Sequence, residues 1–399
     1  MYTEEICMKK LFFLFILFFG ILQQSARAAE PDSVRVSLLT CAPGTEIYAL
    51  FGHTAIRVQV PSQNMDWVYN YGMFNFNTPH FVLKFITGQT DYQLGVVPYV
   101  YFAEEYAMNG SFVIEQELNL RPEEKLRLVE ILQKNYLPAN RIYRYNYFYD
   151  NCTTRARDKI EQSIQGKVIY PVGRDALTFR QIIHRYTKDY DWDQFGIDLC
   201  LGSAADKAID TRSQMFAPFI MMAEADGATI QAADGTSRPL VAKKQQIIQA
   251  QVAQHKPHYL LSPMMSVLLV LVAVLIVSWL EVKRGMPTWW FDLLLFGLQG
   301  GAGCIIAFLF FFSVHPTVDS NWLLWILNPI PLVYLPFMIY KSVKGRRDVY
   351  HIGNIIALTL FIVFWWLIPQ KMPMVIVPLA FGLLIRSAAR LWITRKHKA

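Results

Sequence analysis

Cys152 is the residue of this sequence best placed to act as a nucleophile. It lies where an aromatic and polar run, residues 143–149, gives way to a helical pattern of apolar and charged residues. The first turn of a helix has unpaired backbone N–H groups and a positive dipole end, which favour a thiolate over a thiol. A cysteine at a helix start is more often a packed hydrophobic side chain, so this position alone does not establish chemistry.

A candidate base, His53, lies upstream at the start of a short predicted strand. Acyl transfer through a thiol needs an imidazole that takes up a proton and later returns it. Cys152 and His53 together therefore predict a Cys–His acyl-transfer enzyme. The imidazole also needs a polar group to orient it, and Asn70 on the next predicted strand is best placed by parity. A structural role at the sheet edge explains Asn70 equally well.

Three neighbouring polar residues are secondary candidates. Asn151 can cap the helix that starts at Cys152 through its side-chain oxygen, and this structural role is the favoured one. Arg57 lies on the same strand face as His53 and can pair with a carboxylate or a lipid phosphate. Arg155, one turn along the helix, can do the same or lower the pKa of the thiol. Arginines such as these two more often lie on the surface or form ion pairs.

The N-terminal segment predicts export. A basic pair precedes an apolar run over residues 11–22, and small residues follow at Ala26 and Ala28. This pattern is typical of a signal peptide over residues 1–28 rather than of a structural helix. We expect the mature chain to start near residue 29.

The C-terminal part predicts a membrane domain over residues 263–399. Its composition is almost wholly apolar in five stretches, each long enough to cross a bilayer. We expect the spans at 263–280, 289–313, 322–340, 352–369 and 373–391. Basic residues gather in alternate loops and at the C-terminal end. The positive-inside rule therefore predicts an inner-membrane protein with a cytoplasmic C-terminus and a periplasmic catalytic domain, with its linker, over residues 29–262.

The charge distribution argues against nucleic-acid binding. The formal net charge is +7, but residues 281–399 alone hold 12 Lys or Arg against 4 Asp or Glu. The basic residues therefore orient membrane helices, and the exported segment is close to neutral. No nucleic-acid partner is expected.

Periodicity predicts an α+β fold for the exported segment. Apolar alternation predicts strands at 34–39, 54–60, 67–71, 111–119 and 141–147, mostly antiparallel because the connections are short. Helical patterns occupy 122–136, 152–164 and 179–186. A hairpin is expected within 226–238, followed by a polar linker over 243–256. We expect the helix that starts at Cys152 to pack on a small sheet.

The exported segment contains three cysteines, Cys41, Cys152 and Cys200. In an oxidising periplasm this number suggests one disulfide bridge and one remaining thiol. A bridge between Cys41 and Cys200 leaves Cys152 free, as a nucleophile requires, although the sequence alone leaves the pairing open. Neither a metal nor a cofactor is expected.

Four segments together resemble a known family. They are residues 38–44 (LLTCAPG), 51–57 (FGHTAIR), 69–72 (YNYG) and 150–155 (DNCTTR). They resemble the periplasmic domain of the Lnb-type lipoprotein N-acyltransferases of Bacteroidota, and the five-span tail is similar to that family too. The order of histidine before cysteine also resembles circularly permuted papain-like enzymes such as lecithin:retinol acyltransferase. The resemblance implies a permuted papain-like periplasmic domain followed by an all-α membrane domain of five transmembrane helices.

The resemblance implies transfer in two steps. Cys152, with His53 as base, takes an acyl chain from a membrane phospholipid as a thioester and releases a lysophospholipid. The α-amine of the diacylglyceryl-cysteine at a lipoprotein N-terminus then attacks the thioester, and an N-acylated lipoprotein leaves. Both substrates carry long chains whose exposure to water costs about 0.8 kcal/mol per methylene, which favours a membrane-embedded enzyme.

Aromatic residues of the exported segment can form an interfacial or acyl-lining surface, or belong to the core. They are Phe74, Phe76, Phe81, Phe85, Tyr99, Tyr101 and Phe102. We expect about half of them to be core residues.

Three other functions stay open. A phospholipase differs only in using water as the acceptor. A peptidoglycan amidase or peptidase of the papain-like superfamily needs a polar cleft and no five-span anchor. In a membrane sensor or assembly scaffold, Cys152 is buried or disulfide-bonded.

Overall fold

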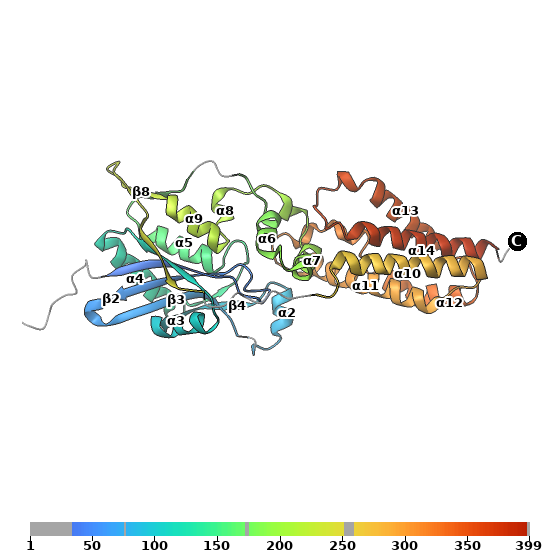
Figure 1. Ribbon diagram of the computed structural model, residues 1–399, viewed down its shortest axis with the longest axis horizontal. Helices are drawn as coiled ribbons and strands as arrows, with labels where there is room; N and C mark the ends of the chain where they lie inside the picture. Colours follow the sequence, from blue (N-terminus) through green and yellow to red (C-terminus); the bar gives the residue numbers. More distant parts are fainter. Residues whose placement is uncertain (1–33, 76, 172–174, 251–258, 397–399) are drawn as a thin grey trace, which may run out of the picture.

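The computed structural model describes residues 34–75, 77–171, 175–250 and 259–396. These residues form an elongated molecule with a sheet-rich domain at one end and a bundle of long helices at the other (Figure 1). Helices α2 (Phe81–Ile86), α6 (Phe179–Thr187) and α7 (Asp191–Cys200) lie between the two. The predicted signal peptide lies outside the described residues.

A seven-stranded antiparallel sheet forms the centre of the first domain, with the strand order β10-β5-β1-β2-β3-β4-β6. Its strands are β1 (Arg35–Cys41), β2 (His53–Val60), β3 (Met65–Met73), β4 (Asp91–Pro98), β5 (Val113–Leu118), β6 (Ile142–Arg144) and β10 (Val241–Ile248). All the predicted strands are present, and the antiparallel arrangement is confirmed. The register of β1 on β2 pairs Cys41 with His53 at one end of the sheet.

Two strands of the sheet, β4 and β10, were not predicted, so the sheet is larger than expected. β4 contains Gly95 and ends in a proline, which weakens its strand pattern. β10 is an edge strand on which residues 242–246 are exposed, and it pairs with β5 where a polar linker was predicted. Edge strands often carry lysines and other polar side chains that protect the open edge, so the sequence of such a strand resembles that of a linker.

The helices that the sequence predicts in this domain are confirmed, namely α4 (Pro122–Tyr136), α5 (Cys152–Ser163) and α6. The domain also contains α3 (Tyr99–Met108), α8 (Thr211–Gln214), α9 (Pro218–Gly227) and the 3-10 helices η2 (Pro61–Gln63) and η3 (Ser203–Asp206). The predicted hairpin is present as β8 (Thr229–Gln231) and β9 (Ser237–Pro239), which form a small sheet with β7 (Lys167–Ile169).

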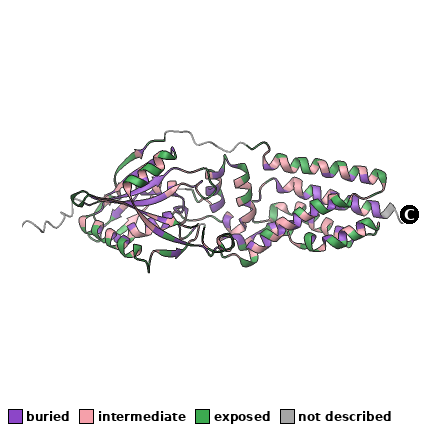
Figure 2. Cartoon of the chain, turned by 90° about the horizontal axis from the view of Figure 1, so that it is seen from below, coloured by how far each residue is buried: buried purple, intermediate pink, exposed green. Residues whose placement is uncertain are grey.

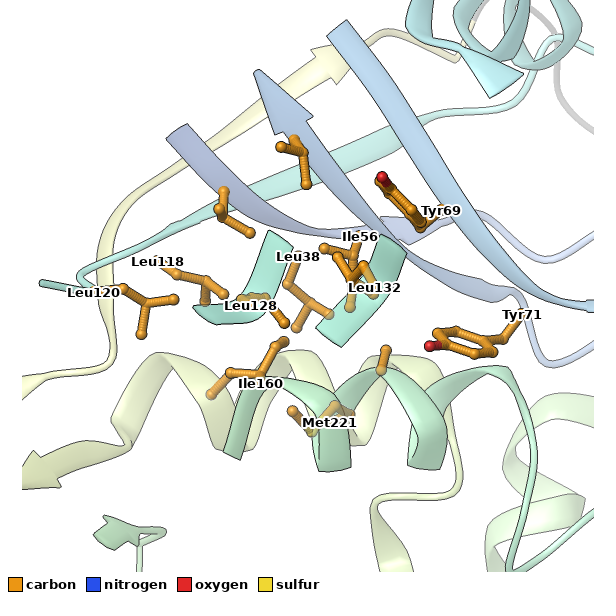
Figure 3. Packing of buried hydrophobic residues seen from close by; sticks show 14 of the residues in the cluster. Leu38, Ile56, Tyr69, Tyr71, Leu118, Leu120, Leu128, Leu132, Ile160 and Met221 are labelled. Carbon is orange, nitrogen blue, oxygen red and sulfur yellow. The ribbon is translucent and has the colours of Figure 1, made fainter. Parts of the chain in front are cut away.

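An apolar core fixes α5 on the sheet. Leu38 and Ile56 of the sheet pack with Leu128 of α4 and Ile160 of α5, and each of the four is at most 2% exposed (Figure 3). On the opposite face of the sheet, α3 contributes Phe102 to a second apolar cluster. Burial of each such side chain stabilises the fold by about 1.5–3 kcal/mol. The helix that carries Cys152 therefore rests on a rigid support.

The second domain contains α10 (Pro263–Arg284), α11 (Trp289–Phe312), α12 (Ile330–Val343), α13 (Val349–Val363) and α14 (Ile376–Lys396), with 3-10 turns η4 (Val318–Ser320), η5 (Trp322–Trp325) and η6 (Trp365–Leu367). Among the described residues, four segments are long and apolar enough to cross a membrane: 263–284, 289–312, 322–343 and 376–394. Figure 2 shows exposed residues along the outer sides of these helices.

The fourth predicted span, 352–369, differs from the prediction. Its helix, α13, has 15 residues, fewer than any of these four segments, and gives way to η6 at Trp365. Pro369 disfavours a helical conformation at Ile368, whose backbone is extended with φ −71° and ψ 124°.

The two domains dock through backbone hydrogen bonds on two sides. Val314, just after α11, donates its N–H to the Thr87 carbonyl at 3.0 Å, and Gly202 donates its N–H to the Thr317 carbonyl at 2.9 Å. A side chain at Gly202 would place its Cβ 2.6 Å from the Thr317 carbonyl oxygen. Glycine therefore permits this close approach.

A buried ion cluster joins three of the membrane helices. Arg386 of α14 is 0% exposed and donates to Asp292 Oδ1 of α11 at 2.6 Å and to both carboxylate oxygens of Glu281 of α10 at 2.9 Å. Arg390 adds a second cation 3.1 Å from Asp292 Oδ2. The two cations balance the two carboxylates, so each helix depends on its neighbours to neutralise its charge.

Arg386→Met is expected to destabilise the membrane domain. The change leaves two buried carboxylates without their main partner, which costs about 3–5 kcal/mol. We expect a lower melting temperature of the detergent-purified protein and less protein in the membrane. Arg284→Met, at an exposed position on α10, is the matched control. Equal melting temperatures for the two variants would mean that the cluster does not hold the helices together.

Candidate active site

Helix α5 begins with a complete cap. Asn151 Oδ1 accepts hydrogen bonds from the N–H groups of Thr153 and Thr154, both at 2.9 Å. The Asn151 amide nitrogen donates to two backbone carbonyls at 2.9 Å. The capping role predicted for Asn151 is confirmed, and it places Cys152 as the first residue of the helix.

Cys152 and His53 meet where α5 crosses the start of β2. Each of the two side chains raises or lowers the pKa of the other, both line one cavity, and Cys152 is 9% exposed. The residues that follow them in the chain are joined as well, since the hydroxyl groups of Thr54 and Thr153 lie 3.0 Å apart. The pair predicted from the sequence is therefore brought together by two elements far apart in the chain.

The surroundings favour an ion pair between thiolate and imidazolium. Burial acts to raise the pKa of Cys152, but the charge of His53, its hydrogen bond and the backbone N–H of Thr54 outweigh burial and lower the pKa. Burial acts to lower the pKa of His53, but the charge of Cys152 and hydrogen bonds to Cys152 and Asn70 raise it. Because the thiolate is the nucleophilic form, Cys152 can act as a nucleophile with His53 beside it as a base.

Asn70 contacts the far side of the imidazole. Its Oδ1 lies 3.3 Å from His53 Nε2. In the tautomer protonated at Nε2, His53 donates to Asn70 Oδ1, which leaves Nδ1 free to accept a proton. The structure thus brings Asn70 to His53, and among the described residues its side chain is hydrogen-bonded to the histidine rather than to the sulfur.

A β-bulge brings the β3 backbone against the thiol. The register between β3 and β4 shifts between Asn70 and Met73, and Gly72 in the bulge has φ +90°. A Cβ at Gly72 would lie 3.6 Å from Cys152 Cβ. The left-handed backbone favours glycine here, and it leaves the space beside Cys152 open.

Arg57 pairs with carboxylates within the domain. Its guanidinium donates to both carboxylate oxygens of Asp66, at 2.8 and 2.6 Å, and to Glu115 Oε1 at 3.1 Å. The guanidinium also lies 3.3 Å from the centre of the Tyr99 ring. Of the two roles considered for Arg57, the structure therefore supports the carboxylate partner.

Arg155 has a similar role beside the cap of α5. It donates to the two carboxylate oxygens of Asp150 at 2.6 and 2.7 Å, and its guanidinium lies 3.4 Å from the centre of the Tyr143 ring. These contacts hold the segment before Cys152 in place. The groups that lower the pKa of Cys152 are led by His53 instead.

The predicted disulfide between Cys41 and Cys200 is not formed. Both are free thiols, as are Cys152 and Cys304. Cys41 is buried in the cluster between the sheet and α3 and is hydrogen-bonded to Tyr106, whereas Cys200 ends α7 beside the membrane domain. The two cysteines therefore belong to different layers of the fold.

An apolar cavity of about 1220 Å³ joins the candidate site to the membrane domain. Cys152 and His53 line it in the sheet-rich domain, and Ile305 and Leu309 line it on α11. Among the described residues of its wall are the carboxylates Glu46 and Glu105, but no lysine or arginine. The cavity thus suits long apolar groups better than phosphates.

The aromatic residues singled out from the sequence divide between surface, cavity and core. Phe74, Phe81 and Phe85 stack in a row with ring centres 5.8 and 6.0 Å apart, and the first and last of them line the cavity. Phe102 belongs to the core, and Tyr101 is exposed. Tyr99 lies under Arg57, and Phe76 lies outside the described residues.

Sequence reasoning missed three parts of the site. Thr54 directly follows His53 and lies within the FGHTAIR segment, but no signal in the sequence indicates that its backbone N–H is part of the site. Gly72 follows the strand of Asn70, and a glycine within a strand pattern is a signal for a bulge. Ile305 and Leu309 carry no local signal, because they are apolar residues in an apolar helix.

We expect Cys152 to be the reactive thiol of the folded protein. Alkylation by iodoacetamide should reach half its maximal rate at a pH below the ordinary thiol value of 9.0, because the surroundings lower the pKa of Cys152. His53→Ala removes the largest influence that lowers the pKa of Cys152 against the effect of burial, so the pKa rises and labelling near neutral pH falls.

Peptide mapping provides an internal control for this measurement. Burial raises the pKa of the Cys41 thiol to about 12, so Cys41 should stay unlabelled in both proteins. Identical pH profiles for Cys152 in the wild type and in His53→Ala would contradict the ion pair.

Comparison with known families gives two matches. The family description "Lnb N-terminal periplasmic domain" matches residues 22–185, and "Lnb transmembrane domain" matches residues 254–398. No curated protein and no solved structure matches the chain. The first match covers both residues of the thiol–imidazole pair, and the second covers every membrane helix. The chain therefore belongs to the Lnb family, as a membrane protein with a periplasmic α+β domain followed by a helical membrane domain.

Proposed function

We propose that this protein is a lipoprotein N-acyltransferase of the bacterial inner membrane. It transfers an acyl chain from a phospholipid, through a thioester on Cys152, to the α-amine of the diacylglyceryl-cysteine at a lipoprotein N-terminus. The observation that carries the proposal is the thiol–imidazole pair in the wall of an apolar cavity that the membrane domain completes.

In the first half-reaction, Cys152 Sγ attacks the ester carbonyl of the phospholipid. The S–C bond forms, the ester C–O bond breaks, and the lysophospholipid oxygen takes the proton that His53 carries. The backbone N–H of Cys152, unpaired at the start of α5, is the candidate donor to the oxyanion. Asn70 orients the ring through Nε2 during this transfer.

In the second half-reaction, the lipoprotein amine attacks the thioester carbonyl. The N–C bond forms, His53 takes a proton from the amine nitrogen, and the Cys152 thiolate leaves. The products are an amide and the starting thiolate–imidazolium pair. No redox step and no metal-bound water take part.

The finer architecture forms part of the proposal. We take the periplasmic domain as permuted papain-like, because the strand with His53 precedes the helix with Cys152. We take α13 with η6 as a fifth crossing. The C-terminus is then cytoplasmic, and basic residues such as Lys283 and Arg347 lie on that side. Figure 1 supports this orientation, since α14 (Ile376–Lys396) ends at the end of the bundle far from the sheet domain.

The geometry of the site also helps to distinguish the proposed function from the three alternatives. An apolar cavity shared with α11 is a poor fit for the polar stem peptides of peptidoglycan. In the scaffold alternative Cys152 is buried or disulfide-bonded. Cys152 is indeed buried, but it is a free thiol that lines the cavity together with His53, and that arrangement favours the enzyme. A phospholipase has the same first half-reaction, so the acceptor has to be tested directly.

Variants at the pair should separate nucleophile, base and orienting group. Cys152→Ala is expected to abolish transfer, and His53→Ala to lower its rate by about 10²–10⁴-fold, the usual contribution of a general base. Asn70→Ala should cost less, because it only orients the ring. Cys304→Ala, another free cysteine, is the control that keeps full activity. Activity in Cys152→Ala would disprove the thioester route.

The acceptor is tested with purified protein, phospholipid vesicles and a diacylglyceryl lipopeptide that has a free N-terminal cysteine amine. We expect N-acylated lipopeptide and lysophospholipid in equal amounts. Without the lipopeptide, a protein species heavier by one acyl chain and sensitive to hydroxylamine should accumulate, with the added mass on Cys152. Lysophospholipid and free fatty acid in place of acylated lipopeptide would identify a phospholipase, and cleavage of muropeptides would identify a cell-wall enzyme.

A further inference from the structure

One face of α11 forms the membrane end of the cavity. Ile305 and Leu309 both line it, and their spacing of four places them on one side of the helix. Leu309 is 8% exposed, whereas Ile305 is 64% exposed and so belongs both to the cavity wall and to the outer surface of the bundle. The cavity is therefore open at Ile305 toward the surface that faces lipid in a membrane.

This opening lies below the end of the membrane helix. Helix α11 ends at Phe312, so Ile305 lies about 10 Å before that end at a rise of 1.5 Å per residue. The end itself faces the periplasmic domain, because Val314 binds the Thr87 carbonyl there. The opening thus lies at the depth of acyl chains rather than of headgroups.

Helix α2 also borders the cavity, near the end of α11. Phe85 lines the cavity, and its carbonyl accepts a hydrogen bond of 2.7 Å from His315 Nε2, just beyond α11. Val82 and Leu83 on the same helix are 68% and 54% exposed. Exposed apolar side chains at this level are typical of a helix that lies at the boundary between headgroups and acyl chains.

The side chains of the cavity wall favour an acyl chain over a lipid headgroup that carries a phosphate. Its carboxylates, Glu46 and Glu105, repel a phosphate, and the described part of the wall offers no lysine or arginine to bind one. The volume of about 1220 Å³ also exceeds the roughly 300–1,000 Å³ of pockets for small ligands. A long acyl chain fits both properties.

We infer that the acyl chain carried by Cys152 lies along α11, entering from the bilayer between α2 and α11, and that Ile305 and Leu309 set its length. The inference rests on the proposed function, because it takes the occupant to be the chain of the thioester. A larger side chain at either position shortens the space for the chain, and a smaller one extends it. The membrane domain then selects the substrate as well as holding the enzyme in the bilayer.

The test uses vesicles that contain equal amounts of one phospholipid with myristoyl, palmitoyl or stearoyl chains. Full-length protein is given the lipopeptide acceptor, and the chains on the product are measured by mass spectrometry. We expect Ile305→Trp and Leu309→Trp to raise the ratio of myristoyl to stearoyl product by about tenfold or more, since one methylene in an apolar pocket discriminates by about 10–200-fold. Leu309→Ala should shift the ratio the other way.

Leu298→Trp is the matched control, because Leu298 lies on the same helix, is 75% exposed and is not part of the cavity wall. Its chain profile should equal that of the wild type. If Ile305→Trp and Leu309→Trp make product with the wild-type profile, the inference is wrong while the proposed function stands. If the wild type makes no acylated product, the proposed function is wrong, and the chains bound to Cys152 in the intact protein still report whether α11 selects among them.

Discussion

The active-site geometry depends on one buried hydrogen bond, between the hydroxyl groups of Thr54 and Thr153 at 3.0 Å. Both side chains are 0% exposed, and each directly follows a reacting residue, His53 or Cys152. The bond limits how far α5 can slide along β2, while the apolar core beneath holds the helix on the sheet. A displacement of about 1 Å at a reacting group can cost roughly 10²-fold in rate, so this register matters for catalysis as well as for stability.

The position of α5 on the sheet also explains why the site needs the membrane domain. Cys152 is placed at the end of the sheet that faces the membrane helices, and the cavity beside it is lined by residues of α11 and α2 as well as by the sheet domain. Hydrogen bonds on two sides, to Thr87 and from Gly202, fix this docking. An apolar cavity is costly to fill with water but favourable to fill with an acyl chain, so burial of the chain and chemistry at the thiol are coupled.

The parts of the structure that could be predicted are those with local signals. Cys152 was marked by a helix start and Asn70 by strand parity, and α4 was marked by Pro122 at its first turn. Contacts between distant segments carry no such signal: the link from His315 to Phe85 joins two domains, and the exposed polar pattern of β10 imitates a linker. The predicted disulfide is wrong for a related reason, because the number of cysteines does not show in which layer of the fold each one lies.

In the proposed reaction, His53 can serve both half-reactions because acylation of Cys152 would change the proton affinity of its imidazole. In the free enzyme, burial lowers the pKa of His53, but the thiolate charge and the hydrogen bonds raise it above its ordinary value. A thioester carries no charge, so burial then dominates and the ring becomes neutral, which is the form that can take a proton from an amine. When the thiolate leaves, its charge returns and the proton stays on the ring. The proton needed for the next lysophospholipid is thus supplied by the previous acceptor, and a second base is unnecessary.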